Sequence, residues 1–173
     1  GYLVQLVGFL SPAVILLVAG LIVPTIQTTI QSFMNSRGDQ FVGLENFIWI
    51  FTQPQGVRTV LNTVAWVLLA PALSTIAGLA YAVFIDKSRG ENFFKILVFM
   101  PMAISFVGAS IIWRFIYTAR PADQDQIGLF NQLIVWMGGE PLQFLQIEPW
   151  NTLALIAVLI WVQTGFAMVV LSA

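Results

Sequence analysis

Long apolar stretches alternate with polar connections along this chain. Four stretches, residues 6–28, 64–85, 96–116 and 153–171, contain neither Asp nor Glu. A helix of about 20 apolar residues crosses a hydrocarbon core of about 30 Å. Because a backbone in lipid must form its hydrogen bonds internally, we predict that each stretch is a transmembrane helix. The predicted fold is all-α, a polytopic α-helical membrane domain covering residues 1–173.

The first stretch also allows interpretation as a signal peptide. Residues 6–28 form a longer apolar run than the roughly 7–15 residues of a signal peptide. No small-residue cleavage site of the A-x-A kind follows it. We therefore interpret residues 6–28 as the first membrane span.

The basic residues predict how the spans are oriented. The short loop at residues 86–95 contains three of the seven Lys and Arg residues, namely Lys87, Arg89 and Lys95. Lys and Arg are enriched in the short cytoplasmic loops of membrane proteins, so we predict that this loop is cytoplasmic. The longer connections, residues 35–63 and 118–150, then face outward.

Each outer connection contains an amphipathic segment. Apolar residues at 44, 47, 48 and 51 share one helical face, and residues 127–137 show a similar pattern. Such a helix either lies in the membrane interface or packs on its own domain. The pattern leaves both arrangements open.

Composition supports the membrane assignment and excludes several functions. Hydrophobic residues make up 58% of the chain and charged residues 9%, whereas a soluble domain is about 25% charged. A net charge of −1 gives no basic surface for nucleic acid. With no His, no Cys and no acid inside a span, we predict no metal site and no catalytic residues, which disfavours an intramembrane enzyme.

Small side chains recur every four residues in the second span, at Ala70, Ser74, Gly78 and Ala82. A stripe of small residues lets two helices approach closely in lipid. We predict that this stripe is a helix-packing surface, with an interface that moves during function as the alternative.

Polar side chains inside the spans are candidates for a substrate pathway. Gln163 and Thr164 lie in the middle of the fourth span next to Trp161, and Ser105 lies in the third span. Such groups either bond to a neighbouring helix or line a polar pathway, where Trp161 could stack on a sugar ring. Arg114, near the outer end of the third span, either extends to the interface or lines the same pathway.

Several short strings, in order along the chain, resemble the inner-membrane permeases of carbohydrate-uptake ABC importers. The strings are Gly43-Leu44-Glu45-Asn46-Phe47, Leu61-Asn62-Thr63, Gly78-Leu79-Ala80-Tyr81-Ala82, Ile112-Trp113-Arg114, Gly128-Leu129-Phe130-Asn131, Ile160-Trp161 and Gly165-Phe166. Met100-Pro101 stands where the family usually has Leu-Pro. The order and spacing of the strings carry the resemblance, because each string alone is common. It is strongest to the maltose, α-glucoside and glycerol-phosphate type of permease.

The resemblance implies a function and a set of partners. A permease of this family forms the translocation pathway for a sugar or oligosaccharide in a bacterial inner membrane and is not itself an enzyme. It works with a second permease, two cytoplasmic subunits that bind ATP and Mg²⁺, and an extracytoplasmic solute-binding protein. Phe47 and Asn131 would face that binding protein, and Gln163, Thr164, Ser105 and Trp161 would line the pathway.

The resemblance also implies that the sequence is part of a longer subunit. The family's E-A-A loop, which docks on the ATPase, follows a segment like Val169–Ala173, so we expect the loop and about two further spans beyond it. A non-transporting assembly or scaffold subunit is the alternative, and it fits the hydrophobicity equally well but leaves the ordered strings unexplained.

Overall fold

The computed structural model describes residues 1–86 and 88–172, and it describes Leu3 without its side chain. Lys87, counted in the predicted cytoplasmic loop, and Ala173, the last residue of the predicted domain, lie outside the described residues. Within these limits the chain is helical and contains no strand, which confirms the all-α prediction. It divides into two compact units, Gly1–Val60 and Leu61–Ala173.

Three helices of the described chain are long and apolar enough to cross a membrane. They are Val4–Gln31, Pro54–Ile85 and Trp150–Leu171. A bent pair of helices, Glu91–Ala103 and Phe106–Tyr117, becomes a fourth candidate if it counts as one span.

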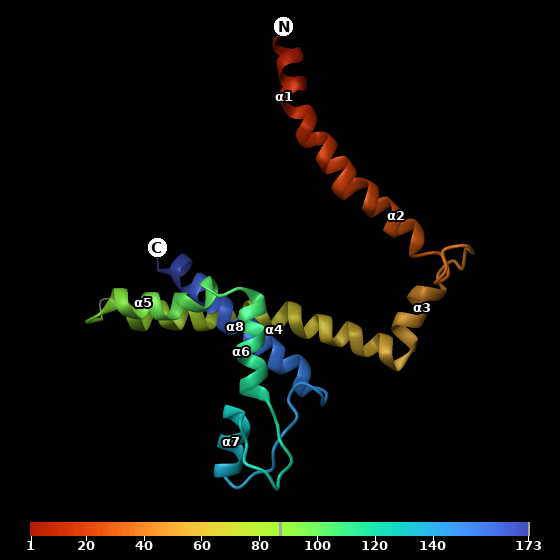
Figure 1. Cartoon of the computed structure of the whole chain (residues 1–173). Coiled ribbons are helices and arrows are strands. Elements are labelled where there is room, and N and C mark those ends of the chain that lie inside the picture. Colours follow the sequence, from red (N-terminus) through yellow and green to blue (C-terminus); the bar gives the residue numbers. More distant parts are fainter. Residues whose placement is uncertain (87, 173) are drawn as a thin grey trace. The chain divides into compact units, whose positions relative to one another are not determined.

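In the first unit, α1 (Tyr2–Leu17), a π-helical turn η1 (Val18–Ile22) and α2 (Val23–Gln31) follow one another as one helical run (Figure 1). The wider turn precedes Pro24, which has no N–H to donate to the carbonyl four residues earlier and whose ring needs room there. The hydroxyls of Thr25 and Thr29 donate to the carbonyls of Leu21 and Thr25, at 2.6 and 2.8 Å. These polar side chains are therefore satisfied by their own helix.

Helix α3 (Glu45–Thr52) is the amphipathic helix predicted in the first outer connection, and it packs against the end of α2. The side-chain nitrogen of Asn46 donates to the carbonyls of Ser32 and Met34, both at 2.8 Å. The ring of Phe47 lies 5.4 Å from that of Phe33, measured between centroids. Asn46 thus satisfies carbonyls that the end of α2 leaves without a helical donor.

Helix α4 (Pro54–Ile85) begins earlier than the predicted second span, which starts at residue 64. The residues before 64 are partly polar but continue the helix, because nothing between Pro54 and Pro71 interrupts the backbone hydrogen bonds. A turn with Gly90 at φ 95° then leads to α5 (Glu91–Phe99).

The predicted third span, residues 96–116, is broken. Helix α5 passes into a short 3-10 turn, η2 (Met100–Ala103), and α6 (Phe106–Tyr117) starts again at an angle of 100° (Figure 1). Pro101 removes one backbone donor within η2, and Ile104 is extended. Ser105 then begins α6 by accepting a hydrogen bond from the Gly108 N–H at 3.1 Å, an N-cap that favours a new helix start.

Helix α8 (Trp150–Leu171) lies between α4 and α5, with a glycine at each contact. A Cβ at Gly78 of α4 would lie 2.5 Å from the Ala167 Cβ, and one at Gly165 of α8 would lie 2.5 Å from the Val98 carbonyl oxygen. Ala82, Ile85 and Met168 form the buried core beside these contacts. Close backbone approach, made possible by glycine, therefore holds the helices of the second unit together.

The second outer connection is folded around a buried amide. Asn131, in α7 (Leu129–Trp136), is 0% exposed. Its side-chain nitrogen donates to the carbonyls of Thr118 and Leu142, both at 3.1 Å, and its oxygen accepts from the Leu142 N–H at 2.7 Å. Asn131 therefore links α7 by hydrogen bonds to the chain before it, at Thr118, and to the chain after it, at Leu142.

Candidate substrate-pathway groove

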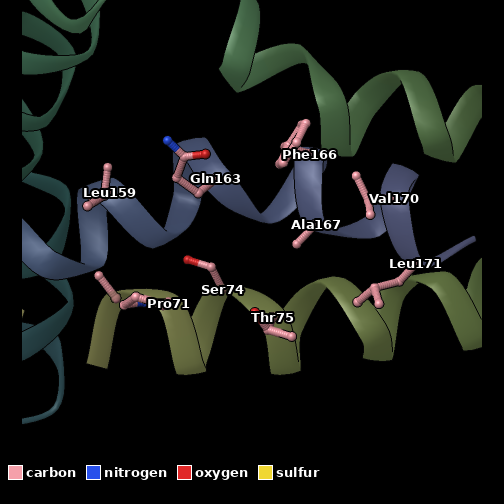
Figure 2. Close-up of a pocket in the computed structure, with 10 residues that line it drawn as sticks. Pro71, Ser74, Thr75, Leu159, Gln163, Phe166, Ala167, Val170 and Leu171 are labelled. Atoms are coloured by element: carbon pink, nitrogen blue, oxygen red, sulfur yellow. The ribbon is translucent and has the colours of Figure 1, made fainter. Parts of the chain in front are cut away.

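A groove of about 400 Å³ runs between α4 and α8 in the second unit (Figure 2). Helix α4 contributes Ala70, Pro71, Ser74 and Thr75, and α8 contributes Leu159, Gln163, Phe166, Ala167, Val170 and Leu171. The groove is within the size range of small-ligand sites, about 300–1,000 Å³. Its lining is mostly apolar and includes no charged side chain.

The predicted small-residue stripe lies on the side of α4 that faces α8. Ala70, Ser74 and Ala82 are 5–6% exposed, and Gly78 is also buried. The hydroxyl oxygen of Ser74 is buried and has no hydrogen-bond partner among the described residues. In Figure 2 this hydroxyl extends from α4 toward α8, so a packing residue also brings a polar atom to the groove.

Gln163 is the polar side chain that α8 adds to the groove. It is half-buried and forms no hydrogen bond with any described residue. Its amide offers two donors and one oxygen with two acceptor positions. Together with the Ser74 hydroxyl and the apolar surfaces of Pro71 and Phe166, it can hydrogen-bond neutral hydroxyl groups while the apolar wall contacts the C–H face of a ring.

The structure does not bring the other predicted pathway residues into this groove. Thr164 is 6% exposed, and its hydroxyl donates to the Ile160 carbonyl at 2.6 Å. The ring of Trp161 contacts Trp113 of α6, with centroids 5.5 Å apart. Ser105 is exposed and caps α6.

The two residues expected to face a binding protein have different surroundings. Phe47 is 36% exposed on α3, where it also packs on Phe33. Asn131 is fully buried and therefore differs from the expectation of a partner-facing side chain. The difference arises because its amide bonds to backbone groups at Thr118 and Leu142, which enclose it on both sides.

Sequence reasoning missed two features of the groove. The prediction placed Ser74 in a packing or moving interface but not in the substrate pathway, and it did not include Thr75. The signal for Ser74 was its position as the one hydroxyl in a stripe otherwise made of Ala and Gly. The signal for Thr75 was weak, because a threonine often bonds to its own helix.

The fold defines the class of protein. Over 98% of its length, the chain matches a chain in the crystal structure of a bacterial ABC transporter that imports the acidic polysaccharide alginate, with a TM-score of 0.74 and 22% identity. A second structure, the alginate transporter in complex with an alginate pentasaccharide-bound periplasmic protein, matches with a TM-score of 0.65 and 22% identity. The chain covers 57% and 56% of those chains. It therefore has the fold of a membrane subunit of an ABC importer.

Sequence similarity narrows this class. The chain is 46% identical over 165 residues to the α-glucoside transport system permease protein AglF of Rhizobium meliloti. It is 44% identical over 165 residues to the osmoprotective compounds uptake permease protein GgtC of Synechocystis. Each alignment covers 95% of this chain, and no family model matches it.

We identify the chain as a homologue of sugar ABC transporter permeases. It spans about half the length of the curated relatives it matches, 49% of AglF and 59% of GgtC.

Proposed function

We propose that this chain forms part of the pathway through which an ABC importer moves a sugar or oligosaccharide of the α-glucoside type across a bacterial inner membrane. The observation that carries the proposal is the 46% identity to an α-glucoside permease over 95% of the chain. The match of the backbone to an ABC importer supports the importer part of the proposal.

The chemistry of the groove between α4 and α8 suits a neutral, hydroxylated substrate. An ion would lose its hydration there without gaining an opposite charge, which is costly in an apolar site. A sugar needs hydrogen-bond partners and an apolar contact surface, and Gln163, Ser74 and Phe166 offer both. Thr164, Trp161 and Ser105 would act on the pathway by fixing the helices around it.

The partners in this proposal are a second permease, two cytoplasmic ATP-binding subunits and an extracytoplasmic binding protein. ATP and Mg²⁺ would bind on the separate ATPase subunits, whose differential affinity for two arrangements of the permeases would drive alternating access. The alginate transporter crystallised with its periplasmic protein supports the role of a binding protein. Phe47 and the connection that Asn131 holds in shape would form the delivery face.

Reconstitution tests the proposal. The subunit that contains this sequence is assembled in proteoliposomes with its partner subunits and binding protein, and ATP hydrolysis and uptake are measured for a panel of α-glucosides. We expect ATP hydrolysis that depends on both the binding protein and its sugar. ATP hydrolysis that no sugar-loaded binding protein stimulates would refute an importer function.

One substitution tests the groove itself. Gln163→Ala removes an amide that would bond to the sugar, and a lost hydrogen bond of about 0.5–1.5 kcal/mol raises the KM for uptake about 2–10-fold. Gln27→Ala, the same change on an exposed position of α2, is the matched control and leaves KM unchanged. Equal KM values for the two variants would show that Gln163 does not bind the sugar in the pathway.

A further inference from the structure

A second groove of about 480 Å³ lies between α8 and α6, on a face of α8 next to the one that carries Gln163, and Leu159 lines both grooves. Its walls are largely apolar: Trp66 of α4, Phe106 and Trp113 of α6, and Leu155, Val158 and Val162 of α8. The polar side chains in its lining are Ser110, Arg114 and Tyr117. Ser110 and Tyr117 already donate to the carbonyls of Val107 and Ala154. The buried indole N–H of Trp113 has no partner among the described residues, and Arg114 is the charged side chain of this lining.

Arg114 also lines a polar pocket of about 210 Å³ that continues from the apolar groove. The two cavities share Arg114, Tyr117 and Leu145. Beyond Arg114 the lining changes to Thr118, Gln143 and Gln146. The combined site is therefore amphipathic, with a hydrocarbon-like channel at one end, amide side chains at the other, and a guanidinium where they meet.

The guanidinium of Arg114 has no ion-pair or hydrogen-bond partner among the residues that the structure describes, 1–86 and 88–172. Neither cavity is lined by Asp or Glu. Arg120, the next cation along the chain, differs, because its guanidinium donates to the Asp125 carbonyl at 3.4 Å. Arg114 is thus an exposed cation beside an apolar groove, with no counter-charge among the described residues, and the complement to this charge is an anion.

We propose that this site binds an anionic glycerophospholipid of the bilayer, with an acyl chain in the apolar groove and the phosphodiester at Arg114. A sugar lacks the alkyl chain that the groove between α6 and α8 would accept. A zwitterionic lipid carries a second, positive charge that Arg114 would repel. Gln143 and Gln146 provide neutral donors for the ester and glycerol oxygens of the head group.

Lipid retention tests the proposal. The full transporter is equilibrated in nanodiscs that contain equal amounts of phosphatidylglycerol and phosphatidylcholine, transferred to detergent, and analysed for retained lipid by mass spectrometry. We expect selective retention of phosphatidylglycerol, and about fivefold weaker retention in the Arg114→Gln variant, the equivalent of about 1 kcal/mol for one cation beside an anionic lipid. Arg120→Gln is the matched control and retains phosphatidylglycerol as the unmodified transporter does.

A second variant separates the acyl chain from the head group. Ser110→Phe fills the groove from an exposed position of α6 and keeps Arg114, so we expect it to reduce retention as well. Three results would overturn the proposal: equal retention of the two lipids, equal retention by the Arg114→Gln and Arg120→Gln transporters, or displacement of the lipid by inorganic phosphate alone. A fourth is cross-linking of the Ser110→Cys variant to the second permease with no lipid retained, which would make the groove a protein interface.

Discussion

A methyl group added at Gly78 tests how closely α4 and α8 approach. The Cβ of an alanine there would lie 2.5 Å from the Ala167 Cβ and 2.7 Å from the Met168 backbone nitrogen. Carbon atoms in favourable contact are about 3.5–4.0 Å apart, so the two helices would have to separate by about 1 Å. The neighbours are backbone and the short side chain of Ala167, which cannot rotate out of the way.

The change in the free energy of unfolding that Gly78→Ala causes is the sum of two opposing effects. Overpacking a well-packed contact costs about 1–3 kcal/mol. Alanine favours a helix over glycine by about 1 kcal/mol. Gly8→Ala is the matched control, because it adds the same methyl group to α1 with nothing within 4 Å. The helix preference is shared by both variants, so the difference between their stabilities isolates the contact.

Thermal stability of the purified transporter measures this difference. For a chain of about 150–250 residues, 1 kcal/mol corresponds to about 2–4 °C in Tm, so we expect Gly78→Ala to melt several degrees below Gly8→Ala. Ala80→Leu, on an exposed position of α4, controls for added volume on the same helix and melts close to the unmodified protein. A Gly78→Ala transporter as stable as the Gly8→Ala transporter would refute the close packing of α4 on α8.

Three further substitutions test the polar contacts that shape the units. Asn131→Ala leaves buried carbonyls without a donor, so we expect a cost of about 1–3 kcal/mol and faster protease cleavage of residues 118–149. Gln124→Ala, at an exposed position of the same connection, is the control, and equal cleavage rates would contradict the prediction. Asn46→Ala frees two carbonyls at the end of α2, and hydrogen exchange should speed up in α3; unchanged exchange would mean that Phe47 alone holds the contact. Ser105→Ala removes the N-cap of α6, which costs about 0.5–2 kcal/mol of stability, and Ser105→Asp restores the cap. Amide hydrogen exchange at Gly108 measures both effects. Exchange that changes in neither variant would show that the bend fixes α6 without the cap.

The helices follow from the sequence because their apolar runs are long and contain few charges. The same signal missed the break between η2 and α6. Hydropathy is averaged over a window, and residues 96–116 are apolar on both sides of the bend. Pro101 gave a local hint, but a proline in a membrane helix more often makes a small kink, since neighbouring groups satisfy the freed carbonyl. The large angle needs the proline, the extended Ile104 and the cap at Ser105 together.

The candidate site was predicted less well than the helices, because the sequence shows that a residue is polar but not which helix lies opposite. Gln163 and Thr164 are adjacent, yet successive residues point about 100° apart around a helix. Gln163 consequently lines the groove with α4, whereas Thr164 is buried and bonds to its own helix. Trp161, which we predicted to stack on a sugar ring, points in another direction around α8 and contacts Trp113 instead.

The strings that resemble the permease family explain why architecture was easier to infer than substrate. Three of their four glycines lie where another backbone approaches: Gly78 of α4 is approached by α8, Gly165 of α8 by α5, and Gly128 by the Thr118 carbonyl. Two of their three asparagines, Asn46 and Asn131, bond to backbone carbonyls. A residue that packs against or bonds to another backbone segment cannot be substituted without moving that segment, and this constraint does not depend on which solute is transported. Side chains that line a groove, such as Ser74 and Gln163, can be exchanged without this cost, so differences in substrate among relatives of similar fold should arise at groove positions and not within most of the shared strings.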